Sequence, residues 1–134
     1  MATTPFVLFV CLHGSAKSVI ASQHFRRLAA ERGVTADTAS AGTEPDAELP
    51  PGVVQGLRGD GIDPVGLRPQ AVTRADLERA SRVVAFGCDL APVAPAGLVV
   101  ERWDDVPAVS EDYGRARDEI AARVRKLVDE LERR

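Results

Sequence analysis

Cysteines, aromatic residues and long apolar runs are all scarce in this sequence. Its two cysteines are too few for a disulfide framework, and no His and Cys residues gather at the spacing of zinc ligands, so no metal is expected. No apolar run reaches the roughly eighteen residues of a membrane span. Residues 1–5 lack the basic start of a signal peptide. Together these absences predict a cytoplasmic protein.

An excess of positive charge is also absent. Seventeen lysines and arginines stand against twenty acidic residues, the net charge is −3, and the two signs are interleaved. Nucleic acid and acidic membrane surfaces are therefore not expected as partners. What the chain does have is an ordinary globular composition, 45% hydrophobic and 28% charged, which predicts one folded domain over residues 1–134.

Short apolar runs alternate with helical patterns along the chain. Strands are expected at residues 6–10, 37–40, 82–86 and 98–101. Helices are expected at residues 18–32, about 50–59, 73–80 and about 116–131. Thr73 and Asp76 have the spacing of a capping box, and Gly33 stands where a helix C-cap belongs. The alternation predicts an α/β fold, a parallel sheet with helices on both faces.

Three segments with reactive side chains each follow a predicted strand. They are Cys11, Cys88 and the segment 103–105, which reads WDD. Ligands of open parallel sheets bind beyond the carboxyl ends of the strands. These three segments are therefore expected to meet at one rim of the sheet.

The first of these segments has the composition of an anion-binding loop. Residues 11–18 read CLHGSAKS and join a predicted strand to a predicted helix. Backbone amides in such a loop and the positive end of the helix dipole favour an anion, and the same field stabilises a thiolate. Cys11 is therefore a candidate nucleophile, with Lys17 as a nearby positive charge. The alternative is that Cys11 is a small buried residue at the end of a strand.

The stretch VLFVCLHGSAKS resembles the active-site loop of low molecular weight protein tyrosine phosphatases and of the arsenate reductases that share their fold. Further stretches resemble the arsenate reductase branch: SAGTEP (40–45), GID (61–63), RPQAVT (68–73), RVVAFGC (82–88) and RARDEIAARVRKLV (115–128). The resemblance runs nearly end to end. It implies a four-stranded parallel sheet and a site with no bound cofactor.

The resemblance also implies roles for the loop residues. Cys11 is the nucleophile, and the hydroxyl of Ser18 steadies its thiolate. The oxyanion is bound by the residues between them: Leu12, His13, Gly14, Ser15, Ala16 and Lys17. The family usually has Asn at the position of Gly14, and glycine adopts the same left-handed backbone without steric cost.

Two departures from the family pattern bear on catalysis. Lys17 stands where the family has arginine, and a flexible ammonium does not grip two oxygens as a planar guanidinium does. In the family an aspartate, usually directly before a proline, protonates the leaving oxygen, whereas this chain reads RWDDVPAVSED. Asp105 and Asp104 are both candidates for this acid, with Asp105 slightly preferred. Alternatively, both are solvated residues of a turn.

The second cysteine bears on the choice between the two branches. Thioredoxin-coupled arsenate reductases carry further cysteines after the third strand, but this chain keeps only Cys88 there, with Ala91 and Pro92 following. The complete disulfide relay is absent. Cys88 is either a redox partner of Cys11 or a packed residue at a strand end. An external thiol of the thioredoxin, mycothiol or glutathione type is expected to complete any reduction.

Three functions remain open. The leading hypothesis is thiol-dependent reduction of arsenate to arsenite at Cys11, and the second is hydrolysis of phosphate monoesters through a cysteinyl phosphate. The third is an oxyanion-binding or redox-responsive module that has lost catalytic activity because Lys17 replaces the family's arginine. Because only Trp103 and Tyr113 can supply an aromatic wall, a small oxyanion such as arsenate, phosphate or sulfate is expected to fit better than a peptide. His24, in the middle of a predicted helix, is expected at the surface.

Overall fold

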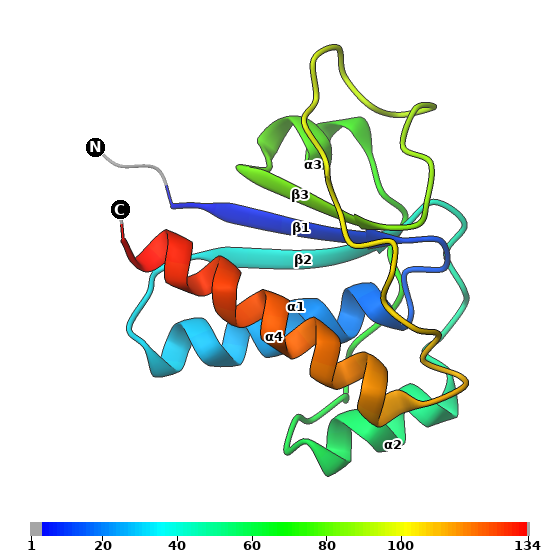
Figure 1. Cartoon of the computed structure of the whole chain (residues 1–134). Coiled ribbons are helices and arrows are strands. Elements are labelled where there is room, and N and C mark those ends of the chain that lie inside the picture. Colours follow the sequence, from blue (N-terminus) through cyan, green and yellow to red (C-terminus); the bar gives the residue numbers. More distant parts are fainter. Residues whose placement is uncertain (1–3, 134) are drawn as a thin grey trace.

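The strand at the centre of the sheet, β1 (Phe6–Cys11), is buried along its whole length. Its unbroken apolar run suits a strand that is covered on both faces. The computed structural model describes residues 4–133 and places β1 in a four-stranded parallel sheet of order β2-β1-β3-β4 (Figure 1). The other strands are β2 (Asp37–Gly42), β3 (Arg82–Phe86) and β4 (Glu101–Arg102). The predicted α/β architecture is confirmed.

Helices cover both faces of this sheet. Figure 1 shows α1 (Lys17–Glu31) and α4 (Tyr113–Glu132) side by side on one face and α3 (Arg74–Arg79) on the other. The short helix α2 (Pro51–Gly59) packs against α4. Each face has its own buried core, because alternate residues of β1 point to opposite sides. Among residues 4–133, no helix is both long enough and apolar enough to cross a membrane.

Local signals set most of the element boundaries. The hydroxyl of Thr73 accepts a hydrogen bond from the amide of Asp76, and the Asp76 carboxylate accepts one from the amide of Thr73, which confirms the capping box of α3. Gly33, just past the end of α1, has a φ of +67°. This left-handed conformation favours glycine and ends the helix as predicted.

The fourth strand begins later than predicted. It was expected at residues 98–101, but β4 pairs with β3 only through Glu101 and Arg102. The amide of Leu98 donates to the carbonyl of Pro95 in a turn, and the side chain of Val99 is 82% exposed. The chain therefore reaches the sheet edge only at Glu101, and the apolar residues before it are not part of the ladder.

The segments that follow β1 and β2 lie against each other at the carboxyl edge of the sheet. Three amides of the second segment donate in succession to carbonyls of the first: Thr43 to Cys11 (3.2 Å), Glu44 to Leu12 (2.7 Å) and Asp46 to His13 (3.0 Å). Gly14 has a φ of +60°, and a Cβ there would lie 2.7 Å from the amide nitrogen of Gly42. The approach therefore requires glycine twice over, once for conformation and once for space.

We predict that Gly14→Ala lowers the free energy of unfolding by about 2 kcal/mol or more, while Gly33→Ala costs only about 1 kcal/mol. Both positions have a positive φ, but a Cβ at Gly33 meets nothing within 4 Å. Gly33→Ala therefore isolates the conformational cost, and the difference measures the steric contact at Gly42. Urea unfolding of the two variants checks this, and equal losses would contradict the close approach.

Candidate active site

A thiol and a hydroxyl face each other where β1 gives way to α1. The Sγ of Cys11 lies 3.0 Å from the Oγ of Ser18. Cys11 is 7% exposed, and Ser18, in the first turn of α1, is fully buried. Because the serine is fixed by its helix, its hydroxyl can donate to a thiolate at Cys11 without a further conformational change.

Cys11 opens onto a cavity of about 660 Å³ at the carboxyl edge of the sheet. The walls come from the end of β1 and the loop after it, the segment after β2, the start of α2, the end of β3, the segment before α4 and the start of α4. The residues that line it are Cys11, Leu12, His13, Ser15, Ala16, Lys17, Asp46, Pro50, Gly52, Val53, Phe86, Ala108, Val109, Ser110 and Tyr113. Five of the six predicted oxyanion-binding residues therefore line it. The sixth, Gly14, is buried against Gly42 instead.

The loop at the N-terminus of α1 has backbone amides that make no hydrogen bond within the described part of the chain. Within residues 4–133, the amides of residues 13–17 donate to no backbone or side-chain acceptor, and no side chain caps the start of α1. Gly14 and Ser15 are nevertheless buried. Buried amides without an acceptor are rare in proteins, and at a helix N-terminus they suit an anion. The loop can therefore hold a tetrahedral oxyanion beside Cys11.

Lys17 lines the cavity, but its ammonium already has a partner. Its Nζ donates to the backbone carbonyl of Val106 at 2.8 Å. Val106 lies in the segment between β4 and α4 and is buried. Lys17 thus ties this segment to the loop and leaves two ammonium hydrogens for an anion. It supplies a positive charge, but not the two parallel donors of an arginine.

The cavity also contains a carboxylate that the sequence did not single out. Asp46 accepts a hydrogen bond from the Oγ of Ser15 at 2.7 Å, and its other oxygen lies 3.5 Å from the Nδ1 of His13. The sequence did place Asp46 shortly after the second predicted strand. Because ligands of open parallel sheets bind beyond the carboxyl ends of the strands, this position could have marked Asp46 as a candidate site residue.

Neither aspartate expected to be the acid lines the cavity. The Oδ1 of Asp104 accepts a hydrogen bond from the amide of Gly87, the residue just after β3, at 2.7 Å. Asp105 is 79% exposed and pairs with Arg123 at 2.7 Å, and this hydrogen bond holds the pKa of Asp105 below its ordinary value. An arginine partner on α4 has drawn Asp105 away from the site. Its position in this structure gives no support to a role as proton donor.

The aromatic side chains are also arranged differently from the expectation. Trp103 is partly buried and packs against the core, with ring centroids 5.8 Å from Phe9 and 5.6 Å from Phe86, and it does not line the cavity. Phe86 and Tyr113 do line it. The site thus has two aromatic residues in its walls, of which the sequence identified Tyr113.

Cys88 lies in the core on the opposite face of the sheet from Cys11. It is 4% exposed, its Sγ donates to the carbonyl of Val10 at 3.6 Å, and both cysteines are free thiols. Burial, together with the nearby Cys11, raises the pKa of Cys88. A buried thiol with a raised pKa is a poor nucleophile, so the structure matches the packed role better than the redox role.

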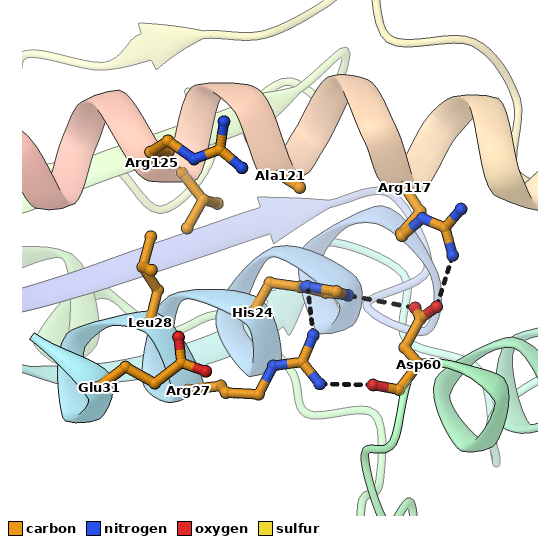
Figure 2. Close-up of a pocket in the computed structure, with 9 residues that line it drawn as sticks. His24, Arg27, Leu28, Glu31, Asp60, Arg117, Ala121 and Arg125 are labelled. Carbon is orange, nitrogen blue, oxygen red and sulfur yellow. Dashed lines mark hydrogen bonds and ion pairs between the residues drawn. The ribbon is translucent and has the colours of Figure 1, made fainter.

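Beneath Tyr113 lies a buried carboxylate, Asp60, at the end of α2. Asp60 accepts hydrogen bonds from the hydroxyl of Tyr113 at 2.8 Å, from Arg117 and from the Nε2 of His24 at 3.2 Å (Figure 2 shows the Arg117 and His24 contacts). Burial alone would raise the pKa of Asp60, but the hydrogen bonds from Tyr113 and Arg117 lower it below its ordinary value. The carboxylate is therefore ionised and anchors Tyr113, which lines the cavity next to Cys11.

His24 is buried in this network, so the expectation that it lies at the surface was wrong. Its Nδ1 accepts from Arg27 at 3.4 Å, while its Nε2 faces Asp60 (Figure 2). A neutral ring with its proton on Nε2 satisfies both partners. Burial lowers the pKa of His24 and outweighs the attraction of Asp60. Geometry and desolvation therefore agree on a neutral imidazole.

The family model that describes the low molecular weight phosphotyrosine protein phosphatases matches residues 6–95. No curated protein sequence matches the chain significantly. Residues 6–95 contain β1, the anion loop and Asp46. The match thus covers about two thirds of the chain and every part of the site except the segment before α4 and Tyr113 at the start of α4.

Solved structures with this fold include both phosphatases and arsenate reductases. A low molecular weight protein tyrosine phosphatase from T. tengcongensis is 23% identical with a TM-score of 0.85, covering 95% of this chain and 99% of that one. An arsenate reductase from Archaeoglobus fulgidus is 29% identical with a TM-score of 0.72, covering 92% and 98%. A thioredoxin-dependent arsenate reductase from Corynebacterium glutamicum is 27% identical with a TM-score of 0.80. This chain is covered over 98% and spans 63% of that protein.

We predict that acid weakens the fold through His24. Because the pKa of His24 is lowered in the native state, the unfolded chain takes up the proton first as the pH falls below about 6.5, and the free energy of unfolding then decreases. The contribution of one proton is at most about 1.4 kcal/mol per pH unit. Urea unfolding at pH 7.5 and 5.5 measures the decrease.

His24→Gln should make that decrease smaller, whatever it does to stability at pH 7.5. If His24→Gln leaves the decrease unchanged, the neutral buried imidazole is not its source.

Proposed function

Because the chain belongs to the low molecular weight phosphotyrosine protein phosphatase family, we propose that it hydrolyses phosphate monoesters, with Cys11 as the nucleophile. The observation that carries the proposal is the Cys11 thiol, 3.0 Å from the Ser18 hydroxyl, on a cavity whose loop has free amides. The thiolate attacks phosphorus and the alcohol leaves. Water then hydrolyses the cysteinyl phosphate and releases the thiolate.

The loop supplies the electrostatic part of the catalysis. Amides of residues 13–17 donate to the phosphoryl oxygens, and the dipole of α1 adds partial positive charge at the same point. The hydroxyl of Ser18 stabilises Cys11 as a thiolate, both before the attack and when it leaves. A free, reduced Cys11 fits the cytoplasm, which we propose as its setting.

Lys17 makes this a slower catalyst than one with arginine in its place. Its ammonium attracts the phosphate but also holds the carbonyl of Val106, so it cannot grip two phosphoryl oxygens in the transition state. Removing one such donor commonly reduces kcat about 100-fold to 1,000-fold. We therefore propose a real but modest activity in place of a lost one.

The size and lining of the cavity favour an ester over a bare oxyanion. A volume of about 660 Å³ is within the range of pockets for small organic ligands. The walls include Phe86 and Tyr113, which can contact an apolar or aromatic leaving group. This changes the preference drawn from the sequence, which weighed only Trp103 and Tyr113.

Arsenate reduction is the second candidate, favoured by the two arsenate reductases among the similar structures. Arsenate would form a Cys11–S–As adduct with loss of water. An external thiol of the thioredoxin, mycothiol or glutathione type would then attack the Cys11 sulfur, giving a mixed disulfide and arsenite. The two thiols supply the two electrons that arsenic gains. Cys88 takes no part, because it is buried in the other core.

The two candidates are separated by assaying purified protein with 4-nitrophenyl phosphate and, separately, with arsenate and a thiol. We expect phosphate release that Cys11→Ser reduces at least about 1,000-fold, and that Cys88→Ser leaves unchanged. Arsenite formation without phosphatase activity would favour the second candidate. If neither substrate reacts while phosphate still binds, the chain is a silent oxyanion-binding module.

Lys17→Arg should raise kcat for 4-nitrophenyl phosphate by about 10-fold to 100-fold, because the fork restores two parallel donors. Lys126→Arg, the same exchange on the exposed face of α4, is the matched control and should change nothing. A Lys17→Arg variant that is no faster than wild type would mean that Lys17 does not limit the rate.

A further inference from the structure

We propose that Asp46 donates the proton to the leaving oxygen. This rests on the phosphate ester hydrolysis proposed above and adds the acid that the reaction needs. An alkoxide or phenoxide is a poor leaving group, so a positioned acid accelerates its departure. The resemblance put that acid on the segment after the fourth strand, and this chain has it on the segment after β2.

Asp46 is the only carboxylate among the residues that line the cavity in the described part of the chain. The two aspartates after β4 are both engaged elsewhere: Asp104 binds the amide of Gly87, and Asp105 binds Arg123. Bringing Asp105 into the cavity would require breaking its ion pair and reorienting its segment. Asp46 already lines the cavity.

The backbone fixes Asp46 against the loop that carries the nucleophile. Amides of residues 43, 44 and 46 donate to the carbonyls of residues 11, 12 and 13, at 2.7–3.2 Å. The hydroxyl of the buried Ser15 then holds the Oδ2 of Asp46 at 2.7 Å. One carboxylate oxygen is thereby anchored. The other, Oδ1, lies 3.5 Å from the Nδ1 of His13 on a side chain that is 41% exposed, and this is the oxygen that would carry and deliver the proton. Acid and nucleophile thus belong to one rigid unit.

The other proton donors in the cavity are less suited. The hydroxyl of Tyr113 donates to Asp60, and burial together with this bond raises the pKa of Tyr113. The ammonium of Lys17 is bound to Val106, and lysine is a much weaker acid than a carboxylic acid. His13 is the remaining competitor. Its side chain is 54% exposed, and its Nδ1 lies 3.2 Å from the carbonyl of Glu44.

The proton returns to Asp46 in each cycle. In the first step Cys11 forms the S–P bond, the P–O bond to the alcohol breaks, and the Asp46 carboxyl gives its proton to that oxygen. In the second step water attacks the cysteinyl phosphate, and the Asp46 carboxylate takes the proton that water loses. The S–P bond breaks, and Cys11 is again a thiolate. No external acid, base or oxidant is consumed.

The test is a leaving-group series with Asp46→Asn, which keeps an oxygen to accept from Ser15. The substrates run from 4-nitrophenyl phosphate, whose phenolate leaves easily, to phenyl phosphate and benzyl phosphate. We expect kcat/KM to fall less than about 5-fold for the first and about 100-fold or more for the last two. Damage to the fold would lower all three alike, so the changing ratio is the signature of a lost acid. Ser15→Ala, which removes the anchor alone, should give a smaller loss of the same kind.

Asp104→Asn, Asp105→Asn and His13→Gln complete the series. Asp104→Asn and Asp105→Asn should leave the three rates in their wild-type ratio. His13→Gln, which changes a residue of the proposed anion loop, should lower all three rates by one common factor. A loss that grows along the series in any of these variants, but not in Asp46→Asn, would overturn the assignment. So would equal losses for all three substrates in Asp46→Asn. If wild type releases alcohol from none of the esters, the proposed function itself fails, and the role of Asp46 fails with it.

Discussion

The site depends on the contact between the segments that follow β1 and β2. A Cβ at Gly14 would meet the backbone of Gly42 at 2.7 Å, and a Cβ at Gly42 would meet the backbone of Gly14 at 2.5 Å. Two glycines therefore face each other where no side chain fits. Three backbone hydrogen bonds continue this contact from residue 43 to residue 46. The anion loop and Asp46 are consequently held at fixed distance by main-chain atoms, whatever the neighbouring side chains do.

Lys17 has a structural role in addition to the anion binding proposed for it. Its bond to Val106 holds the segment between β4 and α4 against the start of α1. That segment supplies Ala108, Val109 and Ser110 to the cavity. A longer guanidinium that turned toward a phosphate would release this hold. The charge at position 17 is therefore shared between binding the anion and shaping the cavity, which weakens the first role.

The sequence was sufficient for the fold and for placing Cys11 beside Ser18 where the first strand ends, because both depend on local patterns. Apolar runs, the capping box at Thr73 and the spacing from Cys11 to Ser18 act within a few residues of each other. The parts that it missed depend on residues far apart in the chain. Asp105 turns outward because Arg123 on α4 attracts it, and His24 is buried because Asp60, 36 positions later, lies against it. Asp46 enters the cavity through contacts with residues about 31 positions earlier.

The wall formed by Tyr113 links the cavity to the buried network around Asp60. In α2, a Cβ at Gly56 would lie 2.3 Å from the Tyr113 ring. Only glycine at this position leaves room for the ring. The hydroxyl of Tyr113 is fixed by Asp60, which Arg117 and His24 hold in turn. The ring can therefore contact a leaving group only in one orientation. Because this network does not include residues of the anion loop, changes in it should alter the cavity wall around Tyr113 and leave the contact between Cys11 and Ser18 in place.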